Sequence, residues 1–160
     1  MSVRMTWEEA VERLASTHTG IVTTLRRDGM PISTPVWFVV YGGSVYFGSP
    51  SKSKKVARLG RDSKVGFLVE GGERWAELWA VHLTGNATLI DDAAEQEAVT
   101  ALLAEKYAGF STPRSQYPED SRRFYESDTQ RVMYRIDAED RVLSWDNTKL
   151  ELGVVNPDLP

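Results

Sequence analysis

The sequence predicts a mainly β protein, a closed antiparallel barrel with helices at its periphery. Six or seven segments have the β-branched and aromatic composition of strands, and glycine-containing turns separate several of them. No part of the chain alternates strand and helix at the spacing that a parallel sheet requires. Because an open sheet of this size would leave exposed edges, we expect the strands to close into a barrel.

The first third of the chain predicts a helix followed by a meander of three strands. Thr6 and Glu9 have the spacing of a capping box, and the apolar residues after them predict an amphipathic helix over 7–16. The pairs Asp28-Gly29 and Gly42-Gly43 are typical of tight turns. Around these turns the predicted strands cover residues 20–26, 31–41 and 44–48.

The middle of the chain predicts a short helix, two strands and a longer helix. The short helix is expected to begin near residues 51–53 and to end at Gly60. Asp92 and Glu95 repeat the capping-box spacing at the start of the longer helix, which reaches Tyr107. Between the two helices the predicted strands cover residues 63–70 and 75–90, with Gly71-Gly72 as the turn.

The last third predicts a loop, a helical turn and two closing strands. Pro113 and Pro118 indicate a loop over 108–120, and a helical turn follows over 121–126. The closing strands are expected over 131–137 and 141–145. A single domain over 1–152 contains all of these elements, and residues 153–160 are expected to form a mobile tail.

Composition argues against several classes of function. A net charge of −4 and a pI of about 5.3 do not suit a general nucleic-acid binder. No apolar run is long enough for a transmembrane helix, and no signal-peptide pattern is present, so we expect no membrane contact and a cytoplasmic location. The chain has no cysteine, and His18 and His82 have no partner at ligand spacing, so we expect no metal site.

A basic run is the clearest functional signal. Lys52, Lys54, Lys55 and Arg58 fall within seven residues at the predicted start of the short helix and alternate with serines. Helix N–H groups, lysine charges and serine hydroxyls together suit a phosphate group. A solvated helix face is the alternative interpretation, and on composition alone it is the commoner one.

The tryptophans allow two interpretations as well. Trp37, Trp75, Trp79 and Trp145 either line a pocket for a planar ligand or belong to the core.

Six short segments occur in a characteristic order, at 21–29, 33–38, 45–47, 54–59, 61–65 and 83–87. This order resembles the pyridoxamine-phosphate-oxidase-like flavin split barrels, especially the actinobacterial branch that includes enzymes dependent on FMN or on the deazaflavin coenzyme F420. The closing stretch 141–150 is similar to the same branch, and the resemblance covers about residues 7–150.

The resemblance implies a six-stranded Greek-key split barrel and a homodimer with two cofactors at its interface. The strand over 34–39 would lie along the flavin ring, Gly48 and Ser49 would flank the ribityl chain, and residues 53–55 would hold the phosphate. The expected cofactor-binding residues are Thr34, Pro35, Val36, Trp37, Phe38, Gly48, Ser49, Ser53, Lys54, Lys55 and Trp145.

The implied function is hydride transfer between bound FMN, or alternatively coenzyme F420, and a small conjugated substrate. Backbone N–H groups of the strand over 34–39 would stabilise negative charge on the reduced ring. Family members that oxidise pyridoxamine phosphate carry an Arg-x-His-type motif after a C-terminal Trp; its absence here predicts another substrate. No side chain is identified as a proton donor. A non-catalytic flavin or haem binder and a lipid-binding barrel remain alternatives.

Overall fold

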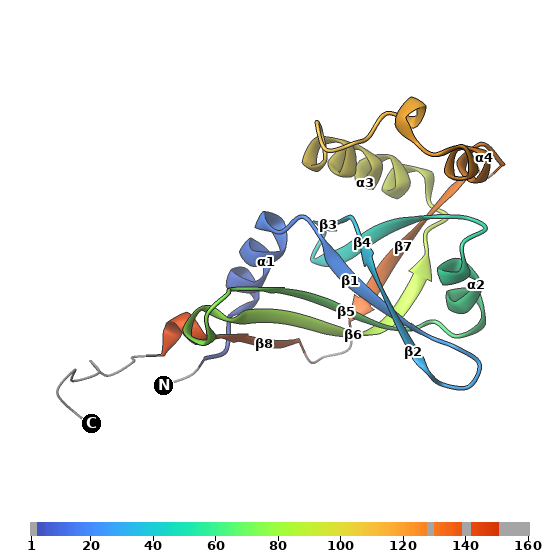
Figure 1. The fold of residues 1–160 in the computed structure, drawn as a ribbon. Coiled ribbons are helices and arrows are strands. Elements are labelled where there is room, and N and C mark those ends of the chain that lie inside the picture. Colours follow the sequence, from blue (N-terminus) through green and yellow to red (C-terminus); the bar gives the residue numbers. More distant parts are fainter. Residues whose placement is uncertain (1–2, 128–129, 139–141, 151–160) are drawn as a thin grey trace, which may run out of the picture.

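The computed structural model describes residues 3–127, 130–138 and 142–150 (Figure 1). Three single-turn 3-10 helices, η1 to η3, accompany the helices and strands. The elements in chain order are α1 (Trp7–Ser16), β1 (Gly20–Leu25), β2 (Pro31–Val36), β3 (Phe38–Tyr41), β4 (Ser44–Pro50), α2 (Lys54–Arg61), β5 (Lys64–Gly71), η1 (Trp75–Glu77), β6 (Trp79–Leu89), α3 (Ala93–Lys106), η2 (Arg114–Gln116), α4 (Glu119–Ser127), β7 (Arg131–Ala138), β8 (Leu143–Asp146) and η3 (Asn147–Lys149).

All strands of the described residues belong to one antiparallel sheet with the order β2-β1-β5-β6-β7-β4-β3. β8 lies off this path, because it pairs with the first part of β6 while β7 pairs with the last part. The two ends of the path, β2 and β3, are consecutive in the chain and only Trp37 separates them. This one bent segment therefore closes the circuit of the barrel, with helices at the periphery (Figure 1).

The prediction of an antiparallel barrel with peripheral helices is confirmed, but the count of six strands is wrong. The described residues contain eight strands. The segment 31–41 forms two strands instead of one, because it leaves β1 after Val36 and joins β4 from Phe38 onwards. The closing strand β8 is an additional strand beside β6.

Three predicted boundaries also differ. The strand expected from Trp75 begins at Trp79, because residues 75–77 form a 3-10 turn whose Trp75 carbonyl accepts a hydrogen bond from Asn147 Nδ2 at 2.7 Å. The expected helical turn is the longer helix α4, which begins inside the predicted loop at Glu119. The last strand begins at Leu143; Arg141 and the proposed tail 153–160 lie outside the described residues.

The main core fills the barrel interior with the inward-facing side chains of the strands. Phe38, Phe47 and Phe67 are fully buried, and the rings of Phe38 and Phe67 meet edge to face at 5.0 Å between centroids. α1 covers one end of the barrel with Ala10 and Leu14. Its predicted capping box is present, since the Thr6 hydroxyl accepts from the Glu9 N–H and the Glu9 carboxylate accepts from the Thr6 N–H.

A second, smaller core joins α3 to the outside of the barrel. Val99 on α3 is buried against Val39 and Tyr46 of strands β3 and β4, with Leu103 and Met133 packed beside them. The helix begins at Asp92, whose carboxylate accepts from the Glu95 N–H at 2.7 Å. This separate packing leaves room between α3 and the barrel wall, and the candidate site lies there.

We expect Gly72→Ala to destabilise the fold more than Gly29→Ala. Both glycines have positive φ values, 94° and 81°, which cost a side chain about 1–2 kcal/mol. A Cβ at Gly72 would in addition overlap the Glu77 backbone, whereas nothing lies within 4 Å of one at Gly29. Urea unfolding should therefore give a free energy of unfolding that is about 1–3 kcal/mol lower for Gly72→Ala than for Gly29→Ala. Equal losses for the two variants would contradict the close approach of this turn to η1.

Candidate functional site

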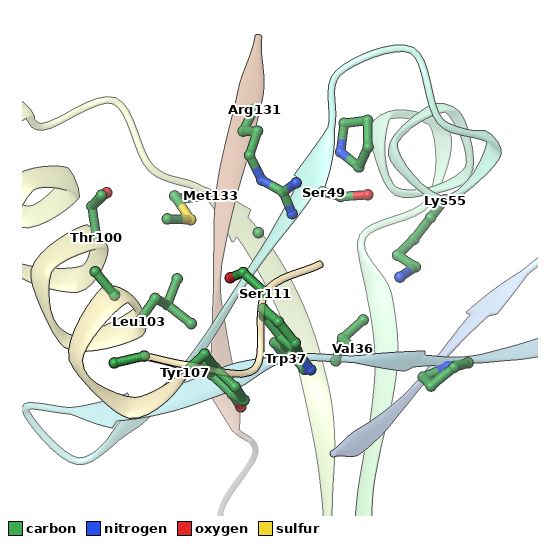
Figure 2. A pocket seen from close by; sticks show the side chains of 15 residues that line it. Val36, Trp37, Ser49, Lys55, Thr100, Leu103, Tyr107, Ser111, Arg131 and Met133 are labelled. Carbon is green, nitrogen blue, oxygen red and sulfur yellow. The ribbon is translucent and has the colours of Figure 1, made fainter. Parts of the chain in front are cut away.

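A cavity of about 580 Å³ lies between α3 and the barrel wall (Figure 2). Its walls come from the end of β2, the bend at Trp37, the end of β4, the start of α2, the start of β7 and one face of α3. The described residues that line it include no carboxylate and no histidine. Of the residues expected from the sequence, those that line it are Pro35, Val36, Trp37, Gly48, Ser49 and Lys55.

One end of the cavity is cationic. Lys55 extends from the first turn of α2, and Arg131 extends from the start of β7; both point into the cavity in Figure 2. Burial, together with the nearby guanidinium groups of Arg58 and Arg131, lowers the pKa of Lys55 from 10.5 to about 8. No ion pair within the described residues involves Lys55 or Arg131. An anion would relieve this repulsion, so this end suits a phosphate.

Gly48 lets Arg131 lie close to the barrel strand. A Cβ at Gly48 would be 3.1 Å from the Met133 sulfur and 3.7 Å from Arg131 Nε. The three residues are neighbours because β4 pairs with β7, with Gly48 opposite Met133 and Pro50 opposite Arg131. A side chain at position 48 would therefore displace Met133 and crowd the guanidinium.

Two serines connect the cavity to the start of α2. The buried Ser49 lines the cavity, and its hydroxyl is 3.0 Å from the Ser53 hydroxyl. Ser53 caps α2, since its oxygen accepts from the Val56 N–H at 3.3 Å. Ser53 therefore supports Ser49 and the helix start without lining the cavity. Lys54 is exposed and does not line the cavity.

Three consecutive residues of the segment over 34–38 line the cavity, namely Pro35, Val36 and Trp37. Phe38 is fully buried in the core and does not line the cavity. Thr34 also lies off the cavity lining, and its hydroxyl is buried with no hydrogen-bond partner among the described residues. Trp37 is the residue of this segment that the bend exposes, at 43% of its surface.

The other end of the cavity is aromatic. The rings of Trp37 and Tyr107 are stacked, 4.3 Å apart between centroids and 5° from parallel. Tyr107 ends α3 and is itself almost fully buried. Burial raises the pKa of the Tyr107 hydroxyl above its usual value of 10. The hydroxyl is therefore protonated and neutral at physiological pH.

Trp145 does not line this cavity. It lies on β8, which pairs with the first residues of β6, and it is opposite Ala80. The hypothesis that Trp145 approaches the cofactor stays a prediction, and it requires a second copy of the chain.

Sequence reasoning missed the contributions of Arg131, Met133 and the cavity-facing residues of α3. Arg131 is one charged residue at a predicted strand end, and only the pairing of β7 with β4 places it near Lys55. The position of Tyr107 beside the predicted loop over 108–120 suggested at most a lid role. No local sequence signal distinguishes either residue, because both act through tertiary contacts.

The curled antiparallel sheet and the peripheral helices define a split-barrel fold. The chain belongs to the pyridoxamine 5'-phosphate oxidase family, whose family model matches residues 6–140. No curated protein matches the sequence.

Solved structures agree with this assignment. The conserved hypothetical protein Rv2991 of Mycobacterium tuberculosis is 30% identical, with a TM-score of 0.78 over 94% of this chain and 91% of that one. A FAD-binding protein of Mycobacterium smegmatis is 17% identical, with a TM-score of 0.62 over 90% of this chain and 98% of that one. A haem-binding protein of the same organism is 16% identical, with a TM-score of 0.63 over 91% of this chain and 60% of that one. The last two show the fold alone.

None of the helices in the described residues is both long and apolar enough to cross a membrane. The His, Asp and Glu side chains of the same residues form no group of three or more that could hold a metal ion.

We expect Lys55 to titrate near pH 8 and Arg131→Gln to raise this midpoint. Removing the guanidinium removes one of the positive charges that disfavour the ammonium form. NMR titration of the lysine side chains measures the midpoint, and the signal lost in Lys55→Arg identifies Lys55. A wild-type midpoint near 10.5 would contradict the half-buried position of this amine, and an unchanged midpoint in Arg131→Gln would contradict the proximity of the two cations.

Proposed function

We propose that this protein binds a flavin or deazaflavin nucleotide in the cavity and acts as an oxidoreductase on a small conjugated substrate. FMN is the first candidate for the cofactor and coenzyme F420 is the alternative. The observation that carries the proposal is a single cavity that joins a cationic end, at Lys55 and Arg131, to an aromatic end, at Trp37 and Tyr107. A nucleotide of this class has a phosphate at one end and a flat ring at the other.

The donor set fits the phosphate end of such a group. Lys55, Arg131 and the Ser49 hydroxyl converge on the cavity, and the described lining contains no carboxylate to repel an anion. Lysine and arginine together give charge-assisted hydrogen bonds, which are the strong ones. These residues would hold the phosphate, and Ser53 would keep Ser49 and the start of α2 in place.

The bend at Trp37 fits the ring end. Trp37 belongs to neither strand ladder, because β2 ends at Val36 and β3 begins at Phe38. Its ring lines the cavity with part of its surface exposed. The protein residues would orient the ring and exclude water, while the bound cofactor would supply hydride transfer.

A non-catalytic binder is the second candidate. The observation in its favour is that the described cavity lining has no histidine or carboxylate to act as an acid or base. Reduction of the bound cofactor, followed by reoxidation with candidate conjugated substrates, separates an enzyme from a binder: only an enzyme accelerates reoxidation.

We expect Lys55→Ala to weaken FMN binding about ten- to a hundredfold, because a charge-assisted contact of about 1.5–3 kcal/mol is lost. Lys54→Ala is the matched control, since this neighbouring lysine is exposed and lies off the cavity lining. Calorimetric titration of FMN and of the deazaflavin into the apo proteins measures both affinities. Equal affinity in wild type and Lys55→Ala would place the phosphate site elsewhere. Mass spectrometry of the molecules released from denatured protein identifies the natural cofactor.

We propose in addition that the protein is a homodimer. The strand registers place Ile21, Leu68, His82 and Leu143 in one row on the outer face of the sheet. Leu143 is 55% exposed, and Trp145 lies two residues further along the same face of β8. A second copy covering this row would remove apolar surface from water.

We expect light scattering at micromolar concentration to give the mass of a dimer, and Leu143→Asp to shift the protein toward the monomer. A charge placed in a covered apolar row would lose its hydration on association. Leu89→Asp is the matched control, because Leu89 is a similarly exposed leucine, at 52%, at the far end of β6 and outside this row. A monomeric wild-type mass would overturn the proposal.

A further inference from the structure

The strand pair β1–β2 separates at the place where the segment 31–41 changes partner. Gly20 pairs with Val36, and continuing this register by two residues would pair His18 with Phe38. That rung is missing, since the ladder of β1 with β2 ends at Gly20 and Val36, and Phe38 pairs with Phe47 of β4. Backbone groups buried at such a split need other hydrogen-bond partners.

The Tyr107 hydroxyl occupies the position of the missing rung. It accepts a hydrogen bond from the Phe38 N–H at 2.8 Å and donates to the His18 carbonyl, 2.7 Å away. The Phe38 carbonyl is also within reach, at 2.9 Å. One side chain from the end of α3 thus bridges the two backbones that β1 and β2 no longer connect.

The same residue fixes Trp37. The backbone of Phe38, the next residue, is held by the Tyr107 hydroxyl, and the Trp37 ring lies parallel to the Tyr107 ring. Trp37 is therefore restrained at its backbone and on one ring face, while 43% of its surface stays accessible. Few rotamers satisfy both restraints, so the accessible face has a defined orientation in the cavity.

We propose that Tyr107 is a positioning residue, which replaces the missing backbone rung and thereby sets Trp37 as the surface on which the flavin ring stacks. This inference rests on the proposed function, because it assigns the ring end of the same cavity. The inference assigns a separate role to each end of the cavity. Lys55 and Arg131 select the phosphate, and the Trp37–Tyr107 stack selects a flat aromatic ring, whatever group is attached to that ring.

The affinities of two ligands distinguish the ring end of the cavity from its phosphate end. Riboflavin has the ring without the phosphate, and FMN has both. Tyr107→Phe keeps the ring but removes the hydroxyl, so we expect it to weaken both ligands by the same factor of about three to ten, the range of one aromatic stack. The ratio of the two affinities should stay unchanged. Lys55→Ala should instead weaken FMN alone and bring the two affinities together.

A double-mutant cycle tests the link between the two aromatic residues. Trp37→Ala should weaken both ligands in the wild-type background and have little further effect in the Tyr107→Phe background, because the same contact is already lost. The visible circular dichroism of bound FMN should change in Tyr107→Phe, since the ring environment changes.

Tyr46→Phe is the control for a purely structural role. Tyr46 is also a buried tyrosine, and its hydroxyl donates to the Glu95 carboxylate at 2.6 Å, away from the cavity lining. It should lower the melting temperature without changing either affinity or the dichroism. Unchanged flavin binding in Tyr107→Phe, with a lower melting temperature, would overturn the inference and leave the proposed function intact. A wild-type protein that binds neither FMN nor riboflavin would overturn both.

Discussion

The change of partner at Trp37 is the constraint on which the rest of the structure depends. One continuous segment must pair with β1 through Val36 and with β4 from Phe38 onwards, because only this closes the circuit of the sheet. The two ladders diverge at the bend, so the backbone groups of His18 and Phe38 that face the split do not pair with each other. Buried backbone groups without partners cost free energy comparable to a lost hydrogen bond. The fold therefore needs an additional element at the bend, and α3 with Tyr107 is that element.

The position of α3 follows from this requirement and from two anchors. At one end the Tyr107 hydroxyl bonds to the split backbone. At the other end Glu95 accepts from Tyr46 and pairs with Arg135 at 3.0 Å, and these hydrogen bonds connect the helix to β4 and β7. Between the anchors only one small cluster around Val99 is buried. A helix held mainly at its ends leaves space along its length, and this space is the cavity.

The sequence predicts those parts of the fold that depend on local patterns. The bounds of α1 agree with the capping box and the apolar spacing after Thr6, and the turns at Gly29 and Gly42-Gly43 divide the meander as expected. The break at Trp37 could not be predicted, because the β-branched and aromatic residues on both sides of it are equally typical of one strand. The site residues likewise divide into those that a local pattern predicts and those that depend on tertiary contacts. The basic run indicated Lys55, whereas Arg131 and Tyr107 reach the cavity only through the β4–β7 register and the packing of α3.

The cationic end of the cavity is an arrangement that the free protein disfavours. Lys55 is half-buried beside two guanidinium groups, and its lowered pKa shows that its charged form is less stable here than in water. Above a pH of about 8 the amine is neutral in the free protein, so the attraction for an anion decreases as the pH rises through this value. A bound phosphate would reverse the effect, since its negative charge favours the ammonium form and raises the pKa again. Binding at this end is therefore coupled to uptake of a proton at alkaline pH, by the same linkage that relates any pKa shift to a binding free energy. Two cations from α2 and β7 line this half-buried end, and no ion pair of the described residues involves either of them, which favours a binding site over a simple packing gap beside α3.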